Sequence, residues 1–499
     1  MRGNNLKLFN KAEECKTSTA IIVSGRNFSY RDLLVASCRV AGSLLDERND
    51  LKGERIAFMV PPGFDYVAVQ WGIWRAGGVA VPLGLQYPDP EIEYTVTHSE
   101  TTTVITVKEF EESLTLICQT QGSKLRLVQE MLSGPSVEMP ILESGRPAMI
   151  LYTSGTTSRP KGVLMTHENI QAQVTSLIEA WEWTSKDHIL LVLPLHHIHG
   201  IINILTCSLM SGAKCDMHIG FNCESAWKQL AAGNLTLFMA VPTIYSKLID
   251  GWENSPSDVK MKLSQGASRL RLMVSGSSAL PVAVLERWKA ITGHVLLERY
   301  GMTEIGMALS NPLHGERRPG YVGTELPEVE VRCVDEKGSR IGPGKEGEIE
   351  VRGKTVFQGY WKNPEATKSA FRGDWFRTGD IAIMDRGSYR ILGRKNVDII
   401  KTGGYKVSAL EVEEVLREHP DILDCAVVGI EDFEWGEKVL AVIALRRPGA
   451  IDLRNLREWA KERLAVQKVP RELFEIEKLP RNALGKINKQ ELRARFGER

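Results

Sequence analysis

Hydrophobic and polar positions alternate with two different periods along the first hundred residues. Short apolar or β-branched runs, typical of strands, lie at Ala20–Val23, Arg55–Met59, Val79–Val81 and Thr103–Val107. Amphipathic segments typical of helices lie between them, at residues 29–45, 64–75 and 91–99. Ser29, with Asp32 three positions later, predicts a capping-box start for the first helix. Strands separated by helices of this length predict parallel sheets covered on both faces.

The same alternation continues from Ala148 to about Leu309, and then the pattern changes twice. After Val322, closely spaced strands at Val329–Val334, Glu348–Arg352 and Gly387–Ile391 predict an antiparallel or barrel-like sheet. A more charged, mixed α+β pattern begins near Gly393. The fold class predicted is therefore α/β, with a large N-terminal domain of parallel-sheet α/β subdomains plus a small β-barrel-like subdomain, followed by a small α+β C-terminal domain.

Composition removes several classes of function. The 499 residues are too many for one compact core, and 43% hydrophobic and 25% charged residues are ordinary for a soluble globular protein. A net charge of +1 offers no surplus for binding nucleic acid or anionic lipid. The most apolar region, Ile189–Leu205, is interrupted by Pro194, Gly200 and three histidines, so we expect no membrane span.

Cysteine usage and the N-terminal sequence bear on the compartment. The eight cysteines are scattered and form no Cys-x-x-Cys pair, which indicates a reducing environment. The first residues contain no apolar stretch of signal-peptide length. We therefore expect the cytoplasm or the mitochondrial matrix. The oligomeric state is not predicted.

The strongest chemical signal is Tyr152-Thr-Ser-Gly-Thr-Thr-Ser-Arg-Pro-Lys-Gly162, directly after the apolar run Ala148–Leu151. Small hydroxyl residues around a glycine let backbone N–H groups point at one anion, and Lys161 adds positive charge. This pattern indicates phosphate binding, although a Ser/Thr-rich surface loop is the alternative. It is not a Walker A loop, because Pro160 and Gly162 stand where that motif needs Gly and Ser or Thr. A second glycine pattern, at residues 342–347, lies between predicted antiparallel strands and is interpreted as a hairpin turn.

Three further segments carry residues suited to nucleotide chemistry. In residues 298–304, Tyr300 offers a face for a purine, Thr303 a hydroxyl for a phosphate and Glu304 a hard oxygen ligand for magnesium. Asp380 can accept the hydroxyls of a ribose, and Arg394 can reach the same nucleotide. Lys486 follows a glycine near the C-terminus. Taken singly, these segments are equally compatible with a strand-to-helix turn, a tight turn with a surface arginine, and a solvated lysine.

In this order and spacing, the four segments resemble the adenylate-forming superfamily of acyl-CoA synthetases, luciferases and peptide-synthetase adenylation domains, over roughly residues 15–495. The resemblance implies ATP, Mg²⁺ and coenzyme A as cofactors and co-substrates. It also implies an N-terminal domain at 1–393, a hinge at 394–398 and a mobile C-terminal lid at 399–499. By motif, the implied ATP-binding residues are Thr153, Ser154, Gly155, Thr156, Thr157, Lys161, Gly276, Ser277, Tyr300, Gly301, Met302, Thr303, Asp380, Arg394 and Lys486.

The same resemblance assigns the reactive groups. Lys486, Thr303, Glu304 and His197 would be catalytic, with Glu304 as the magnesium ligand. A carboxylate attacking ATP brings one anion onto another, so the site must neutralise both. A lysine on a mobile lid can be withdrawn after diphosphate leaves, which lets Lys401, Gly403 and Gly404 present a face to coenzyme A. The resemblance leaves Lys395, Asn396 and Val397 open as the pivot of the hinge. They are not separated because the segment carries one extra residue before Gly403.

The acid substrate is indicated by Arg299. A guanidinium in an acyl pocket is costly for a fatty acid but can bind the distal carboxylate of a dicarboxylate. His199 and Lys247 are secondary candidates for the same carboxylate. The alternative for Arg299 is a structural salt bridge with Glu298 or another acid, and the alternative for Lys247 is a solvated position on its helix. The His-x-His-Gly segment at 197–200, together with residues 298–304, resembles malonyl-CoA synthetases, so malonate is the expected small-molecule partner, with methylmalonate not separated from it.

Other functions are weaker interpretations. A medium-chain or aromatic acyl-CoA synthetase is the alternative within the same class, and a catalytically silent nucleotide-binding relative is the alternative from another class. No carrier domain follows the C-terminal region to replace coenzyme A as acceptor, and nothing requires the oxidative step of a luciferase. The histidines at 196–199 lack the spacing and carboxylates of a zinc site.

Overall fold

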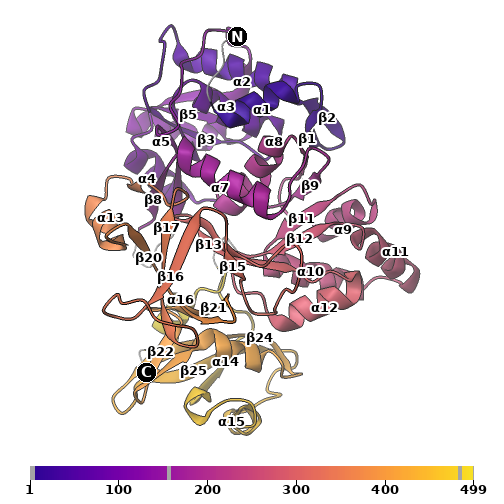
Figure 1. Ribbon diagram of the computed structural model, residues 1–499, viewed down its shortest axis with the longest axis vertical. Coiled ribbons are helices and arrows are strands. Elements are labelled where there is room, and N and C mark those ends of the chain that lie inside the picture. The colour runs from indigo at the N-terminus through magenta and orange to yellow at the C-terminus, as the bar shows by residue number, and fades with distance from the viewer. Residues whose placement is uncertain (1–5, 154–158, 482–485, 498–499) are drawn as a thin grey trace.

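The computed structural model describes residues 6–153, 159–481 and 486–497. Within these ranges two large sheets, a half-barrel sheet and a C-terminal sheet follow one another along the chain. The C-terminal sheet lies at the opposite end of the molecule from the first helices, with the half-barrel between them (Figure 1). The predicted α/β fold class, with its barrel-like subdomain and separate C-terminal part, is confirmed.

The first large sheet has the strand order β18-β8-β7-β4-β3-β5-β6, and its core strands β7, β4, β3, β5 and β6 are parallel. Its strands are β3 (Arg55–Met59), β4 (Val79–Pro82), β5 (Thr103–Thr106), β6 (Lys124–Leu127), β7 (Pro147–Thr153), β8 (Lys161–Thr166) and β18 (Gly359–Tyr360). The strands β3, β4 and β7 are almost entirely buried, as predicted for parallel strands covered on both faces.

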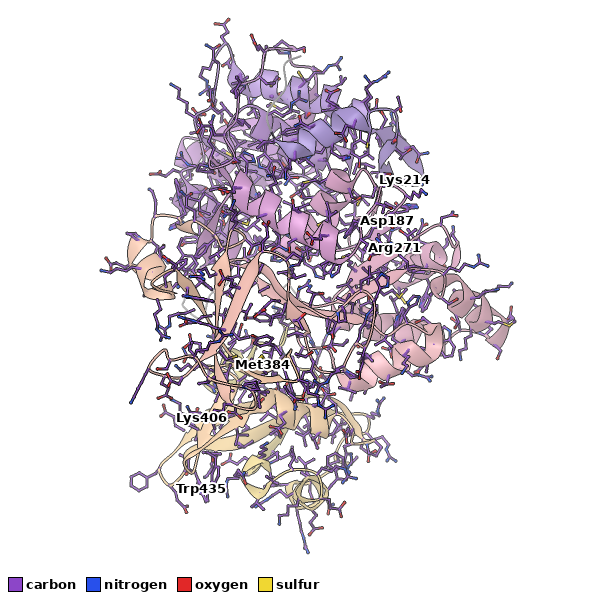
Figure 2. All side chains as sticks on the ribbon, viewed as in Figure 1. Asp187, Lys214, Arg271, Met384, Lys406 and Trp435 are labelled. Atoms are coloured by element: carbon purple, nitrogen blue, oxygen red, sulfur yellow. The ribbon has the colours of Figure 1, made fainter. Side chains whose placement is uncertain are left out.

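The second large sheet has the order β15-β14-β13-β12-β11-β9-β10-β1-β2, with a parallel centre. Its strands are β1 (Thr19–Val23), β2 (Arg26–Ser29), β9 (His188–Leu191), β10 (Lys214–Met217), β11 (Leu237–Ala240), β12 (Leu272–Ser275), β13 (Leu297–Met302), β14 (Gly306–Ser310) and β15 (Thr324–Glu325). Arg271 contacts Asp187 at 2.7 Å (Nη2 to Oδ2; Figure 2), which ties together the chain entering β12 and the chain entering β9.

Helices cover both sheets, and local sequence signals set their ends. They are α1 (Lys7–Glu14), α2 (Tyr30–Leu45), α3 (Phe64–Arg75), α4 (Asp89–Ser99), α5 (Glu111–Gln121), α6 (Val128–Leu132), α7 (His167–Ala180), α8 (Cys207–Ser211), α9 (Cys223–Ala231), α10 (Pro242–Glu253), α11 (Ser257–Ala267), α12 (Val282–Thr292) and α13 (Pro364–Ala370). The predicted capping box of α2 is present, since the Asp32 N–H donates to Ser29 Oγ (3.1 Å) and the Ser29 N–H donates to the Asp32 carboxylate (2.7 Å). None of the helices in the described ranges combines the length and apolar content needed to cross a bilayer.

The half-barrel is antiparallel and consists of β16 (Val329–Val334), β17 (Glu346–Gly353), β19 (Phe371–Arg372), β20 (Trp375–Asp385) and β21 (Ser388–Arg394). The glycine pattern at 342–347 leads from β16 into its antiparallel partner β17, so the hairpin interpretation is confirmed. After Arg394 the chain enters a second lobe with its own apolar core. That lobe contains β22 (Ile399–Thr402), β23 (Tyr405–Ser408), α14 (Ala409–Leu416), β24 (Ile422–Asp432), β25 (Gly436–Leu445), α15 (Leu453–Lys461), β26 (Glu472–Glu475) and α16 (Lys489–Gly497).

Candidate active site

Three parallel strands of the second sheet end at one edge and deliver polar side chains there. The chain leaves β9 toward His197 and His199, and it leaves β12 at Gly276 and Ser277. Strand β13 pairs with β12 at Glu298, so Arg299 lies level with the chain just beyond β12. Ligand sites in open parallel sheets lie at the carboxyl ends of the strands, and this edge has that geometry.

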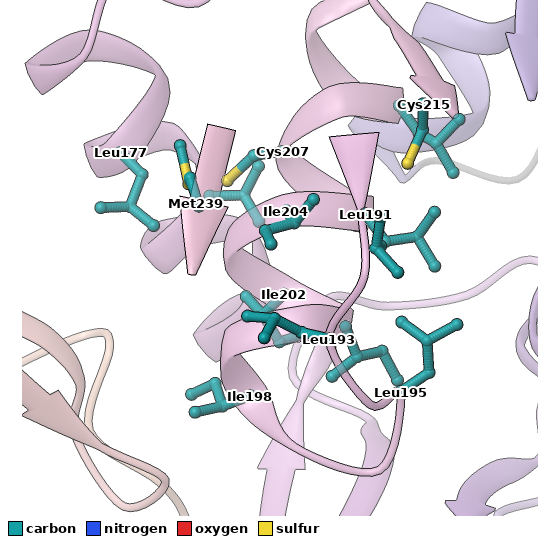
Figure 3. Close-up of a cluster of buried hydrophobic side chains, with 14 of the residues drawn as sticks. Leu177, Leu191, Leu193, Leu195, Ile198, Ile202, Ile204, Cys207, Cys215 and Met239 are labelled. Carbon is teal, nitrogen blue, oxygen red and sulfur yellow. The ribbon is translucent and has the colours of Figure 1, made fainter. Parts of the chain in front are cut away.

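His199 is the first residue of a π-helix, and His197 lies just before it. Residues His199–Thr206 form a π-helix, η2, in which every residue is buried. Apolar side chains from β9, η2 and neighbouring elements surround it (Figure 3), which fixes the direction of the chain that carries His197 and His199. Single turns of π-helix are rare and occur often at functional sites.

Arg299 is a buried cation facing this edge. The residue is only 4% exposed, and burial lowers the pKa of its guanidinium. Its Nε and Nη2 have no hydrogen-bond partner among the described residues. The guanidinium packs against Gly276, where an added Cβ would lie 2.5 Å from Arg299 Cζ. A buried guanidinium with free donors is costly unless an anion occupies the space beside it.

The structure excludes the salt bridge with Glu298 that the sequence left open. Neighbouring residues of a strand point to opposite faces, and the Glu298 carboxylate instead accepts a hydrogen bond from the Gly320 N–H at 3.0 Å. Burial raises the pKa of Glu298 to about 8. Arg299 therefore keeps its donors available for a ligand.

Both histidines beside Arg299 are neutral at pH 7. Burial lowers the pKa of His197 to about 2, and burial together with the charge of Arg299 lowers the pKa of His199 well below its usual range. His199 Nδ1 lies 3.1 Å from Ser277 Oγ, and Ser277 adopts the left-handed conformation (φ 73°) that is strained for a residue with a side chain. Nε2 of each histidine is buried without a partner among the described residues. This edge of the sheet thus combines one cation with neutral polar groups, a set suited to an anion.

A second group of residues lies next to this pocket, where β13 meets the half-barrel. The Tyr300 hydroxyl donates to Asp380 Oδ2 at 2.6 Å, and Arg394 Nε lies 3.2 Å from Asp380 Oδ1. Asp380 and Arg394 are direct partners across β20 and β21. Burial raises the pKa of Asp380, while the charge of Arg394 acts in the opposite direction. Residues 80 positions apart in sequence therefore form one polar cluster.

Glu304 lies beyond Tyr300 in the turn between β13 and β14, which is a strand-to-strand turn and not the strand-to-helix turn considered from the sequence. Gly301, Met302 and Thr303 precede it in that same hairpin, half-buried. The Tyr360 hydroxyl donates to Glu304 Oε1 at 3.0 Å, and Lys161 Nζ lies 4.9 Å from the centre of the Tyr360 ring. Burial raises the pKa of Glu304. Tyr360 was not predicted, since a tyrosine in Gln358-Gly-Tyr-Trp361 carries no chemical signal of its own.

The phosphate loop is only partly described. Thr153 ends β7 and Lys161 begins β8, and the two residues pair across these strands. Ser154, Gly155, Thr156 and Thr157 lie outside the described residues. Glu304 is a single carboxylate, and magnesium commonly binds one or two carboxylates together with substrate phosphates. Within the described ranges, no group of three or more His, Cys, Asp or Glu forms a protein-only metal site.

Lys486 reaches this site from the second lobe. Surrounding protein atoms, together with the charges of Arg394 and Arg299, lower the pKa of Lys486 to about 8. Asp380 acts on Lys486 in the opposite direction. These charge effects place Lys486 near Arg299 and near the Asp380 cluster, with the two lobes in the arrangement that the structure adopts.

Lys247 and the proposed coenzyme A residues lie elsewhere. Lys247 is exposed on α10 with its ammonium 6.0 Å from the Phe221 ring, so it does not join Arg299 and His199. Lys401, Gly403 and Gly404 lie on the β22–β23 hairpin of the second lobe. Lys401 lines an open groove of about 650 Å³ together with Lys395 and Arg493.

A large α/β lobe, a half-barrel and a small lobe that brings a lysine to their junction define the architecture of an adenylate-forming enzyme. The sequence profile of AMP-binding enzymes matches residues 8–361, and the profile of the AMP-binding enzyme C-terminal domain matches residues 411–486. The chain belongs to the AMP-binding enzyme family.

Named relatives cover nearly the whole chain. It is 46% identical to malonate–CoA ligase ACSF3, mitochondrial, of Mus musculus, over 95% of this chain and 88% of the relative. It is 44% identical to the protein of the same name of Homo sapiens, over 98% of this chain and 92% of the relative. Among solved structures, ATP-bound MatB from Rhodopseudomonas palustris superimposes with a TM-score of 0.91 at 32% identity, over 99% of each chain.

Proposed function

We propose that this chain is a malonate–CoA ligase, which converts malonate, ATP and coenzyme A into malonyl-CoA, AMP and diphosphate. The observation that carries the proposal is the buried Arg299, whose free N–H groups face a pocket of neutral histidines. A dicarboxylate can place one carboxylate against Arg299 and leave the other to react. The names of the relatives support malonate as that acid.

In the first step, an oxygen of the free carboxylate attacks the α-phosphorus of ATP. An acyl–oxygen–phosphorus bond forms, the bond to the bridging oxygen breaks, and diphosphate leaves. Lys486 neutralises the charge that builds up between the two anions. Tyr300, Asp380 and Arg394 hold the adenosine, with Gly276, Ser277, Gly301 and Met302 along its pocket. Residues 153–157 and Lys161 hold the phosphates, together with Thr303.

Glu304 would hold the magnesium ion, which would supply positive charge to the phosphates. The hydroxyl of Tyr360 holds the Glu304 carboxylate in place through its hydrogen bond to Oε1 at 3.0 Å. His197 closes the acyl pocket, and Arg299 with His199 binds the distal carboxylate. Lys247 joins them only if α10 moves, since its ammonium lies against Phe221.

In the second step, the sulfur of coenzyme A attacks the acyl carbon, and AMP leaves as the acyl–oxygen bond breaks. We propose that the lobe comprising residues 399–499 turns about residues 394–398 relative to residues 1–393 to allow this. The turn withdraws Lys486 and brings Lys401, Gly403 and Gly404 to the acyl group. Glycines at this hairpin leave room for the narrow pantetheine arm.

The decisive test is diphosphate release from ATP with malonate, methylmalonate, acetate, octanoate and benzoate in turn. Malonate is expected to give the highest kcat/KM. A preference for octanoate or benzoate would replace malonate by the medium-chain or aromatic alternative. Absence of turnover with every acid would indicate a silent nucleotide-binding relative.

We also propose that the protein acts in the mitochondrial matrix, as the word mitochondrial in the names of the vertebrate relatives supports. Fractionation of the source cells, with matrix and cytosolic marker enzymes as controls, tests this. Recovery with the cytosolic markers would place the reaction in the cytoplasm instead.

A further inference from the structure

Helix α12 lacks a cap within its own lobe. It begins at Val282 after Pro281, which has no side-chain hydrogen bond to offer, and its first turn carries no acidic residue. The first N–H groups of any helix have no acceptor inside the helix and need one from elsewhere. This helix matters to the site, because the chain that enters it carries Gly276 and Ser277 a few residues earlier.

The missing cap comes from the second lobe. Glu414 of α14 accepts a hydrogen bond from the Val282 N–H at 2.6 Å, across 132 residues of sequence. Its side chain is 31% exposed, and burial raises the pKa of Glu414, which the bond from Val282 opposes. A carboxylate at a helix N-terminus is favoured both by its hydrogen bond and by the helix dipole.

The neighbouring residue connects this contact to Lys486. Glu413 is buried inside the second lobe, where its Oε1 lies 2.7 Å from Lys489 Nζ. Lys489 also contacts Asp398 at 2.6 Å, and it stands three positions after Lys486. One turn of α14 therefore contacts α12 on one side and the segment that carries Lys486 on the other.

We propose that Glu414 is a positioning residue for adenylate formation, holding the second lobe on the N-terminus of α12 so that Lys486 stays in the site. The inference rests on the proposed function, since it assigns a residue to one of its two steps. The lobe cannot turn for the thioester step without breaking the Val282–Glu414 bond, so the bond favours the first step only.

The test measures both half-reactions in Glu414→Ala. Diphosphate release from ATP and malonate without coenzyme A is expected to fall about tenfold, the low end for a partly exposed hydrogen bond to a charged group. Thioester formation from supplied malonyl-adenylate is expected to stay unchanged or to rise. Glu414→Gln keeps an oxygen that can accept the Val282 N–H, so it should lose less than the alanine variant.

Glu336→Ala is the matched control. It removes an exposed ion pair between the lobes, Lys406–Glu336 at 2.8 Å, whose side chains are 54% and 73% exposed and which should contribute little. Neither half-reaction should change in this variant. Equal losses in both half-reactions of Glu414→Ala, or no loss in either, would overturn the inference.

A second readout separates this inference from the proposed function. Hydrogen exchange at the Val282 amide of the wild type, with ATP bound, should be slower than in Glu414→Ala, and equal exchange would also overturn the inference. If the wild type releases no diphosphate with malonate, the proposed function fails, whereas exchange at Val282 still decides whether Glu414 caps α12.

Discussion

Replacing Arg299 by leucine should change activity and stability in opposite directions. The guanidinium is 4% exposed, and two of its nitrogens have no partner among the described residues, so without a ligand its charge destabilises the fold. Removing one partner of a buried, hydrogen-bonded charge pair, here Arg299 and the distal carboxylate of malonate, costs about 2–5 kcal/mol of binding free energy. That corresponds to a loss in kcat/KM for malonate of roughly 30-fold to several thousand-fold. The melting temperature of the free protein should stay the same or rise, because leucine leaves no unpaired charge in the pocket.

The assay compares kcat/KM for malonate and for acetate, together with thermal unfolding of the ligand-free protein. Acetate has no second carboxylate, so its kcat/KM should change far less than that of malonate. Arg287→Leu serves as the control, because Arg287 makes an exposed ion pair with Glu253 and lies on the outer part of α12. Unchanged kinetics with malonate in Arg299→Leu, or equal losses for malonate and acetate, would refute the assignment of the distal carboxylate to Arg299.

Three other outcomes are expected. Lys486→Ala should slow adenylate formation by about 10²–10³-fold, the usual effect of removing one group that stabilises transition-state charge. Thioester formation from supplied malonyl-adenylate should persist. Equal losses in both half-reactions would contradict the proposed turn of the lobe. Because the pKa of Lys486 is lowered to about 8, its ammonium is lost as pH rises through that value, so kcat/KM for ATP should fall above about pH 8. In Lys486→Arg, whose guanidinium stays charged, that fall should disappear from the pH profile, and its persistence would assign the fall to another group. Gly276→Ala would set a Cβ 2.5 Å from Arg299 Cζ, so the KM for malonate should rise roughly 10- to 100-fold, and an unchanged KM would show that Arg299 can move freely.

Elements with strong local signals could be predicted almost to the residue. Strand β3 and helix α3 begin and end where the apolar pattern places them, and the capping box of α2 joins Ser29 and Asp32 as expected. These features depend only on residues within one turn or one strand of each other, so the local sequence is sufficient to predict them. The hairpin at 342–347 was distinguishable from a dinucleotide loop for the same reason, since its flanking strands are short and antiparallel.

Contacts between segments that are distant in sequence could not be predicted, because no local sequence pattern determines them. The bond from Tyr300 to Asp380 requires the half-barrel to lie against β13, and the bond from Val282 to Glu414 requires the orientation of a whole lobe. Lys247 is exposed because the opposite face of α10 packs on its neighbours. A shift of one position along the helix would turn a side chain from the exposed face toward the buried face, and the sequence alone does not fix this. The π-helical widening of η2 depends on the apolar residues packed around it and not on a local motif.

The charges at the junction give a physical reason for two lobes. Beyond the effect of burial, the charges of Arg394 and Arg299 both lower the pKa of Lys486, and the carboxylate of Asp380 acts in the opposite direction. In the proposed reaction, ATP and a dicarboxylate would bring further negative charge to these cations. Diphosphate would then carry much of that charge away, while the charges of Arg394 and Arg299 would still act on Lys486. Under the proposed function, the loss of diphosphate would therefore weaken the attraction that holds Lys486 in the site and favour the turn of the second lobe.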